Sequence, residues 1–362
     1  MSGAFAAASV LFLVYVSQCF AGAPPVTALF LLNHHLKGRA LCRFFETAPG
    51  GRRIFLLNPF LPHVGAVFAD RIPFVVRRGE DGAIASLEPL SAVSGSSQEI
   101  SFDHPREIRA AAKDVFVDQA KFATLRSEAA AEGLAEFLNK LQQTNGGKRL
   151  EVLEEYFSVR FNLKTLDERL ERYAKSSAYL RSMCFSLFFF ALLLSPIAVF
   201  FLGLPRVWFA LLLYLILSCG AIVWLFVVAY RQTYPQKRRW PLQHMTTIGF
   251  SPFAAIRAND LLVADLAEEV HPLAVGRRLL LEEEFRSFAG EELRRAQFLD
   301  SDGFLLKFLH GFLAQNGVDA ESLFAPPRKE DASQSYCPVC LTQYVVAAGT
   351  CKDCDETSLV HF

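Results

Sequence analysis

The chain has no excess of either charge: its 362 residues include 37 Lys and Arg and 37 Asp and Glu. This balance gives no reason to expect that the whole surface binds nucleic acid. Charged residues are scarce at 20%, whereas hydrophobic residues reach 52% and Phe alone contributes 34 residues. Such a composition excludes a mostly disordered chain. It also exceeds what a soluble core needs, so we look first for membrane segments.

Two long stretches, residues 182–205 and 207–230, lack any charged side chain. At ~1.5 Å per residue each is long enough, as a helix, to cross a hydrocarbon core of ~30 Å. Only Gly203 to Arg206 could turn the chain between them. We therefore expect a two-helix transmembrane hairpin over residues 182–230; the alternative is a buried helical hairpin of a soluble protein. The absence of ionisable groups inside either stretch disfavours ion conduction or a proton relay.

Basic residues flank the predicted hairpin on both sides, and only Arg206 lies in its turn. Lys and Arg near the ends of membrane segments favour the cytoplasmic side. Both flanks, and with them the C-terminus of this multi-pass protein, are therefore expected to be cytoplasmic. The flanking residues are Lys175, Arg181, Arg231, Lys237, Arg238 and Arg239.

The N-terminal leader, residues 1–23, has two interpretations. No Lys, Arg, Asp or Glu precedes Lys37, and residues 4–23 are mostly apolar. The small residues 21–23 resemble the end of a cleaved signal peptide. An uncleaved membrane anchor with its N-terminus outside agrees better with the cytoplasmic flanks of the hairpin.

The remaining sequence predicts an α+β fold. Short apolar runs separated by turn residues predict a β-rich domain over residues 24–103, with strands at 26–32, 40–46, 53–57, 64–68 and 74–77. Helical composition predicts a helical segment over residues 104–181, with helices at 105–143 and 148–181. A helical domain over residues 231–325 has predicted helices at 251–270, 273–289, 291–299 and 303–315. A polar linker, residues 326–335, precedes a C-terminal module over residues 336–362.

Four cysteines form the one specific motif. Cys337 and Cys340, then Cys351 and Cys354, give C-x2-C, ten residues, C-x2-C. Two such turns supply the four thiolates that Zn²⁺ takes in structural sites. The module resembles a zinc ribbon, although its spacer is shorter than in many ribbons. The alternatives are a redox dithiol or disulfides. The other cysteines, Cys19, Cys42, Cys184 and Cys219, are scattered.

A site closed by four thiolates leaves no open position for catalysis. The module is then either a docking surface or a small cap that folds only with metal. Lys352 is the only Lys or Arg in residues 336–362, so binding of nucleic acid there is unsupported.

Other candidate motifs are weaker. His34 and His35 suit a solvated turn, and residues 282–284 (three Glu) suit a solvated helix face. Residues 300–303 suit a helix N-cap rather than a calcium loop, because the Gly is displaced and the twelfth-position Glu is missing. Lys148 follows two glycines without the frame of a phosphate-binding loop. No catalytic triad or carboxylate pair can be argued from spacing.

These observations favour a non-enzymatic, membrane-anchored binding or scaffold protein, with the bilayer and an unidentified protein as partners. One alternative is a membrane enzyme with a site in residues 24–103 or 251–325, which a cleft gathering His63, Asp70, His104 or His271 with carboxylates would favour. Another is an accessory subunit of a transporter or secretion complex.

Overall fold

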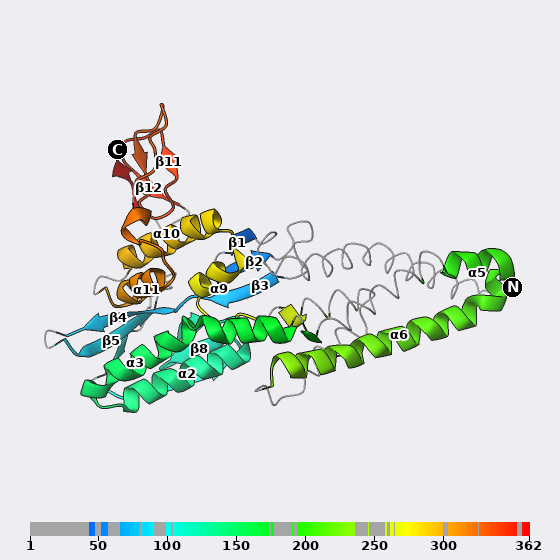
Figure 1. Cartoon of the computed structure of the whole chain (residues 1–362). Coiled ribbons are helices and arrows are strands. Elements are labelled where there is room, and N and C mark those ends of the chain that lie inside the picture. Colours follow the sequence, from blue (N-terminus) through cyan, green and yellow to red (C-terminus); the bar gives the residue numbers. More distant parts are fainter. Residues whose placement is uncertain are drawn as a thin grey trace. The chain divides into compact units, whose positions relative to one another are not determined.

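The computed structural model forms two compact units, each assembled from several stretches of the chain (Figure 1). Unit 1 contains the described residues within Met1–Glu46, Ile54–Phe68 and Leu163–Glu268. Unit 2 contains those within Thr47–Arg53, Ala69–Asn162 and Glu269–Phe362. The structure describes residues 43–47, 52–56, 66–79, 82–89, 99–102, 104–173, 175–176, 190, 194–235, 245, 258, 261–263, 265–299, 303–324, 326–352 and 357–362. The predicted leader and the predicted strand at 26–32 lie outside these residues.

Small sheets occupy the first part of the described chain, where the sequence predicts short strands. β1 (Arg43–Thr47), β2 (Arg52–Leu56) and β3 (Ala66–Asp70) form one three-stranded sheet in that order. β4 (Phe74–Arg78), β5 (Ile84–Pro89) and β6 (Ile100–Ser101) form a second, antiparallel sheet. Three consecutive side chains that begin β4 are buried, so both faces of this strand are covered.

A third antiparallel sheet corrects the sequence prediction. β7 (Ile108–Ala111), β8 (Asp114–Val117) and β9 (Ala120–Thr124) lie where a helix was predicted to begin at residue 105. Alanine favours a helix by propensity, but burial in β8 alternates with the period of two of a strand. Asp118 and Gln119 have φ values of 46° and 74°, which is the backbone of a tight hairpin turn. Tertiary packing here overrides local propensity.

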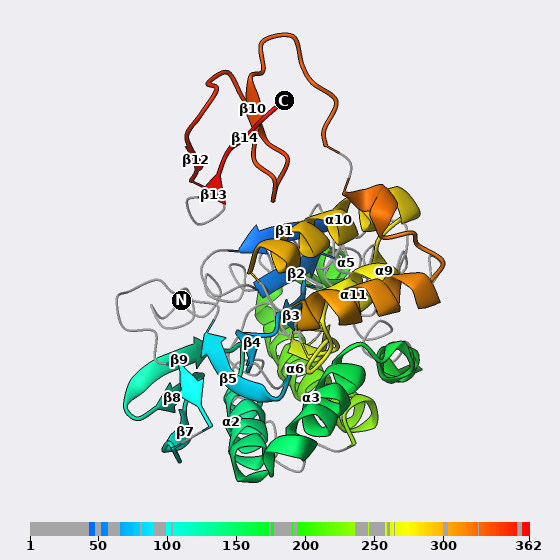
Figure 2. The same cartoon turned by 90° about the vertical axis from the view of Figure 1, so that its left-hand side faces the viewer.

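Helices α2 (Glu128–Gln143) and α3 (Gly146–Arg160) run side by side (Figures 1 and 2). The Ser127 side chain caps α2 by accepting a hydrogen bond from the Ala130 N–H at 3.1 Å. The single helix predicted over 148–181 is wrong in one respect. It is interrupted at Phe161 and Asn162, the last residues of this stretch of unit 2 in the sequence, and helical backbone resumes at residues 163–173.

A helical layer completes unit 2. It consists of α9 (Pro272–Leu279), α10 (Glu282–Leu299), α11 (Phe304–Gln315) and the short 3-10 helix η2 (Glu321–Leu323). The predicted break at Gly290 is absent: the break falls at residues 280–281, and α10 runs through the glycine. Phe157 of α3 joins this layer to the sheet, because its ring packs 5.2 Å from that of Phe304 and 6.4 Å from that of Phe74.

Unit 1 contains the long apolar helix α6 (Leu204–Thr233), preceded by α5 (Ser195–Leu202). Gly203, with φ 78°, reverses the chain between them, and Phe190 stacks on Tyr214 at 3.8 Å. Residues 205–233 are long and apolar enough to cross a membrane, and no other described helix is. The predicted two-helix hairpin is not shown: most of residues 182–193 lie outside the description, and α5 has only eight residues.

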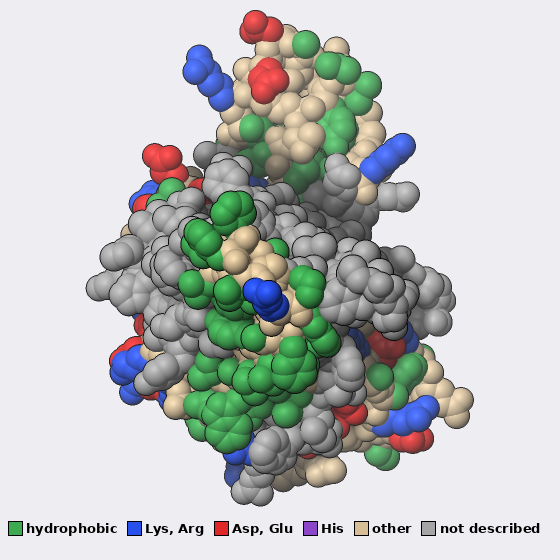
Figure 3. All heavy atoms as spheres, turned by 90° about the vertical axis from the view of Figure 1, so that its right-hand side faces the viewer, with side chains coloured by type: hydrophobic (Ala, Val, Ile, Leu, Met, Phe, Trp, Pro, Cys, Tyr) green, Lys and Arg blue, Asp and Glu red, His purple; other side chains and the backbone are tan. Residues whose placement is uncertain are grey.

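Hydrophobic side chains gather over α5 and α6 on the face shown in Figure 3. Phe200, Phe209 and Trp224 are at least 63% exposed. The C-terminal end of α6 is instead packed within unit 1. There the Tyr234 hydroxyl donates to the Leu262 carbonyl at 2.6 Å, and the Thr233 hydroxyl lies 3.0 Å from that of Ser176.

Helix is described only at residues 258 and 261–263 of the helix predicted over 251–270, and residues 265–269 form turns.

Candidate metal centre

The C-terminal module consists of very short strands joined by tight turns. β11 (Gln343–Tyr344), β10 (Ser335–Tyr336) and β14 (Val360–His361) form one antiparallel sheet in that order. β12 (Thr350–Cys351) pairs with β13 (Thr357–Ser358). Such strands bury almost no apolar side chain, and the core of the module is a cluster of Cys337, Val339 and Cys351.

The first cysteine pair lies on a turn held by backbone hydrogen bonds. The Leu341 N–H donates to the Cys337 carbonyl at 2.9 Å, and the Cys337 N–H donates to the Thr342 carbonyl at 2.9 Å. Leu341 takes a left-handed φ of 62° to close the turn. The Val339 N–H points at the Cys337 sulfur, with N to Sγ 3.4 Å. This turn therefore directs both thiols to one side.

The third thiol, that of Cys351, lies beside the first two but belongs to a different pair of strands. It lies at the end of β12 opposite Thr357 of β13. The Sγ atoms of Cys337, Cys340 and Cys351 lie within 4.8 Å of one another, and all three are free thiols. Cys354 lies outside the described residues, in the segment that links β12 to β13.

The sulfur spacing fits a metal ion. Four thiolates at ~2.3 Å from a tetrahedral zinc ion lie about 3.8 Å apart. The Sγ atoms of Cys340 and Cys351 are 3.8 Å apart. The cluster can therefore hold a metal ion, and its three sulfur donors are the ligands that soft metals prefer.

Burial sets the electrostatics of the cluster. It raises the pKa of the Cys337 thiol to about 11, because a thiolate loses hydration in this environment. A bound cation has the opposite effect, since a coordinating thiol is deprotonated outright. The Tyr344 hydroxyl donates to the Cys351 sulfur at 3.1 Å. This contact raises the pKa of Tyr344 above its ordinary value and supplies a hydrogen bond to a candidate ligand.

The other candidate residues of the sequence occupy structural positions. His271 is buried, and its Nδ1 caps α9 by accepting from the Leu273 N–H at 3.2 Å. Asp70 accepts from the Arg126 N–H at 3.2 Å, and His104 is exposed. Glu282 pairs with Arg277 at 2.7 Å on the surface. In the part of the chain that the structure describes, no other group of His, Cys, Asp or Glu converges as the cysteines do.

Several candidates cannot be placed, because His34, His35, His63, Asp300 and Asp302 lie outside the described residues.

Two residues near the cysteines carry no signal in the sequence. Tyr344 is one of nine tyrosines, and only the fold places it beside Cys351. Arg294 of α10 donates through Nε to the Val339 carbonyl at 3.0 Å. Val339 lies between Cys337 and Cys340, so this arginine contacts the first cysteine turn from 45 positions away in the sequence.

No family model, curated protein sequence or solved structure matches this chain.

Proposed function

We propose that this protein is a membrane-anchored, non-enzymatic binding or scaffold protein whose C-terminal module is a zinc ribbon. The observation that carries the proposal is the convergence of Cys337, Cys340 and Cys351, with one sulfur pair 3.8 Å apart. Cys354 stands at the same spacing from Cys351 as Cys340 does from Cys337. In the proposal it is the fourth ligand.

Zinc is the metal that we propose, because tetrahedral four-sulfur sites take zinc or iron and zinc needs no redox partner. Four thiolates would close the site, so the ion would have a structural role. The module has too small an apolar core to fold by itself, which supports a requirement for metal. Its surface is then available for a protein partner.

Membrane anchorage is supported by the apolar helix α6 and by the exposed apolar side chains on it. In the proposal residues 182–205 form a second span, and both flanks of the hairpin face the cytoplasm. The reducing cytoplasm would keep the four thiols available for metal.

The test combines metal analysis with fractionation. The detergent-solubilised chain, purified under reducing conditions, should contain one zinc per chain and should resist extraction from membranes by alkaline carbonate. A chain without stoichiometric zinc would defeat the ribbon, and a chain released by carbonate would defeat the anchor.

The enzyme and accessory-subunit alternatives remain proposals of lower rank. The roles of His271 and Asp70 in capping and backbone hydrogen bonding give the enzyme hypothesis no support from those residues. Substrate-dependent turnover by the purified chain would favour the enzyme. Stoichiometric co-purification with a transport or secretion machine would favour the subunit.

A further inference from the structure

A chain of hydrogen bonds connects the cysteine cluster to the helical layer of unit 2. The Val339 N–H contacts the Cys337 sulfur, while the Val339 carbonyl accepts from Arg294 Nε. The same guanidinium donates through Nη1 to the Leu323 carbonyl at 2.8 Å. Arg294 therefore bridges a metal-ligand turn and η2, two segments that share no regular secondary structure.

Gly290, one helical turn before Arg294, makes room for this bridge. A Cβ atom at position 290 would lie 2.9 Å from Arg294 Nη1 and 3.3 Å from the Leu323 carbonyl oxygen. A glycine inside a helix costs roughly 0.5–1 kcal/mol relative to alanine. Glycine fits the middle of α10 because the Arg294 side chain passes beside it and leaves no room for a Cβ atom.

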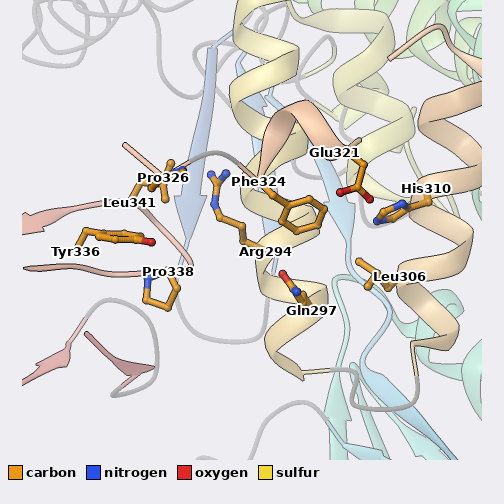
Figure 4. Close-up of a pocket in the computed structure, with 10 residues that line it drawn as sticks. All are labelled: Arg294, Gln297, Leu306, His310, Glu321, Phe324, Pro326, Tyr336, Pro338 and Leu341. Atoms are coloured by element: carbon orange, nitrogen blue, oxygen red, sulfur yellow. The ribbon is translucent and has the colours of Figure 1, made fainter. Parts of the chain in front are cut away.

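The contact between the module and the helices is not closed by apolar packing. A cavity of about 440 Å³ lies there, between Gln297 of α10, His310 of α11 and the module residues Tyr336, Pro338 and Leu341 (Figure 4). Arg294 also lines this cavity. Besides the covalent linker, the arginine bridge is an attachment that the structure shows between the module and α10.

We propose that Arg294 is a positioning residue that makes docking of the cysteine module on α10 depend on the bound metal. The proposal rests on the proposed zinc ribbon. Zinc fixes the turn at Cys337 to Cys340 and so presents the Val339 carbonyl to the guanidinium. The positive charge of Arg294 also lies close to the thiols, where it offsets the net negative charge of a zinc ion with four thiolates.

Linkage gives this proposal a quantitative form. If zinc favours the docked module by some factor, docking must favour zinc binding by the same factor. Removal of the guanidinium should weaken zinc binding about ten-fold, the size expected for hydrogen bonds from a charged donor. Arg294→Lys keeps the charge but cannot bridge two carbonyls in the same way, so it should restore binding only in part.

Photo-crosslinking measures docking directly. p-Benzoylphenylalanine in place of Gln297 enters the cavity and should crosslink to residues 336–341 in the full-length, zinc-loaded chain. Arg294→Gln and removal of zinc by a chelator should each lower the yield about ten-fold. Arg286→Gln is the matched control, because Arg286 lies on the same helix and pairs with Glu282 on the surface.

A second variant tests the bridge without touching the arginine. Gly290→Ala should lower the yield as Arg294→Gln does, although alanine favours the helix. Gly311→Ala on α11 is its control, since nothing lies within 4 Å of a Cβ there.

Zinc content measured in the same samples separates the outcomes. A zinc-loaded Arg294→Gln chain that crosslinks like the unsubstituted chain overturns the coupling. A crosslinking yield that is unchanged by removal of zinc also overturns the coupling. Neither result contradicts the zinc ribbon. Absence of zinc from the unsubstituted chain overturns the ribbon and the coupling together.

Discussion

The carboxylate of Glu292 and the guanidinium of Arg71 form a buried ion pair, with Nη2 to Oε1 2.6 Å and both side chains at most 7% exposed. Arg71 lies between β3 and β4, and Glu292 lies in the middle of α10. The pair joins a strand connection to a helix 221 positions later in the sequence. It is one of the contacts that unite the two ends of unit 2.

Glu292→Ala should lower the free energy of unfolding by about 3–5 kcal/mol, because it leaves a buried guanidinium without its carboxylate. Chemical denaturation in detergent measures the change. Glu88→Ala is the control, since Glu88 pairs with Arg77 at the surface and should cost at most about 1 kcal/mol. Equal effects of the two substitutions would contradict the prediction.

The free energy of unfolding should decrease as the pH is lowered, because His271 is buried in its neutral form. Burial, which is the largest cause, lowers the pKa of His271 from 6.5 to about 3; Arg160 and Arg71 also lower it, and Glu292 opposes them. The unfolded chain therefore binds the proton first. The stability is complete above pH 6.5 and decreases by about 1.4 kcal/mol per pH unit from there towards pH 3.

His271→Asn keeps a residue that can cap α9 and removes this titration. Between pH 7 and pH 5 the unsubstituted chain should lose about 2 kcal/mol more stability than the variant. Denaturant unfolding at both pH values gives the difference. If both chains lost the same stability between pH 7 and pH 5, His271 would bind its proton as readily in the folded chain as in the unfolded chain. That result would contradict the prediction.

The sequence predicts well where chemistry is local. The two C-x2-C pairs predicted the convergence of Cys337, Cys340 and Cys351, because each tight turn supplies its thiols to one side and a structural zinc site takes both pairs. The sequence predicts secondary structure and long-range contacts poorly where tertiary packing determines them. The alanine-rich stretch before Glu128 became strands, since Val115, Val117 and Phe122 are buried in unit 2. Neither Arg71 with Glu292 nor Arg294 with Val339 has any local pattern, because only the fold joins them.

Cys340→Ser should abolish stoichiometric zinc and unfold residues 336–362, while the sheets and helices before the module stay folded. Structural zinc contributes about 10–16 kcal/mol of apparent binding free energy in finger peptides, and an incomplete thiolate shell loses much of it. Metal analysis and hydrogen exchange measure the two effects. Cys219→Ser on α6 should keep its zinc, and a zinc-replete Cys340→Ser chain would refute the ligand assignment.

Tyr344→Phe should weaken zinc binding about ten-fold without unfolding the module. The substitution removes only the hydroxyl that donates to the Cys351 sulfur, and such partners of metal ligands are worth about 10–100-fold in affinity. Competition with a chromophoric chelator measures the change. Tyr336→Phe is the control, because the substitution keeps the ring, whose centroid lies 4.9 Å from that of Phe362. An unchanged affinity in Tyr344→Phe would show that the hydroxyl does not support the metal.

Reporter fusions test the proposed topology. Fusions after residues 181 and 362 should both report the cytoplasm, and a fusion at Pro205 should report the outside, because basic residues flank the hairpin. An exported C-terminal fusion would favour the signal peptide. N-terminal sequencing that begins near Pro24 would then identify its cleavage site.

Helix α6 is longer than a bilayer requires. Its residues 205–233, 29 in all, extend about 44 Å at ~1.5 Å per residue, against a hydrocarbon core of ~30 Å. Tyr230, Thr233 and Tyr234 at its far end are buried within unit 1. If the exposed part of α6 crosses the membrane, the same continuous helix contacts lipid at one end and is packed in the folded protein at the other. A thinner or thicker bilayer, which changes the tilt of such a helix, would then strain the packing around Tyr234.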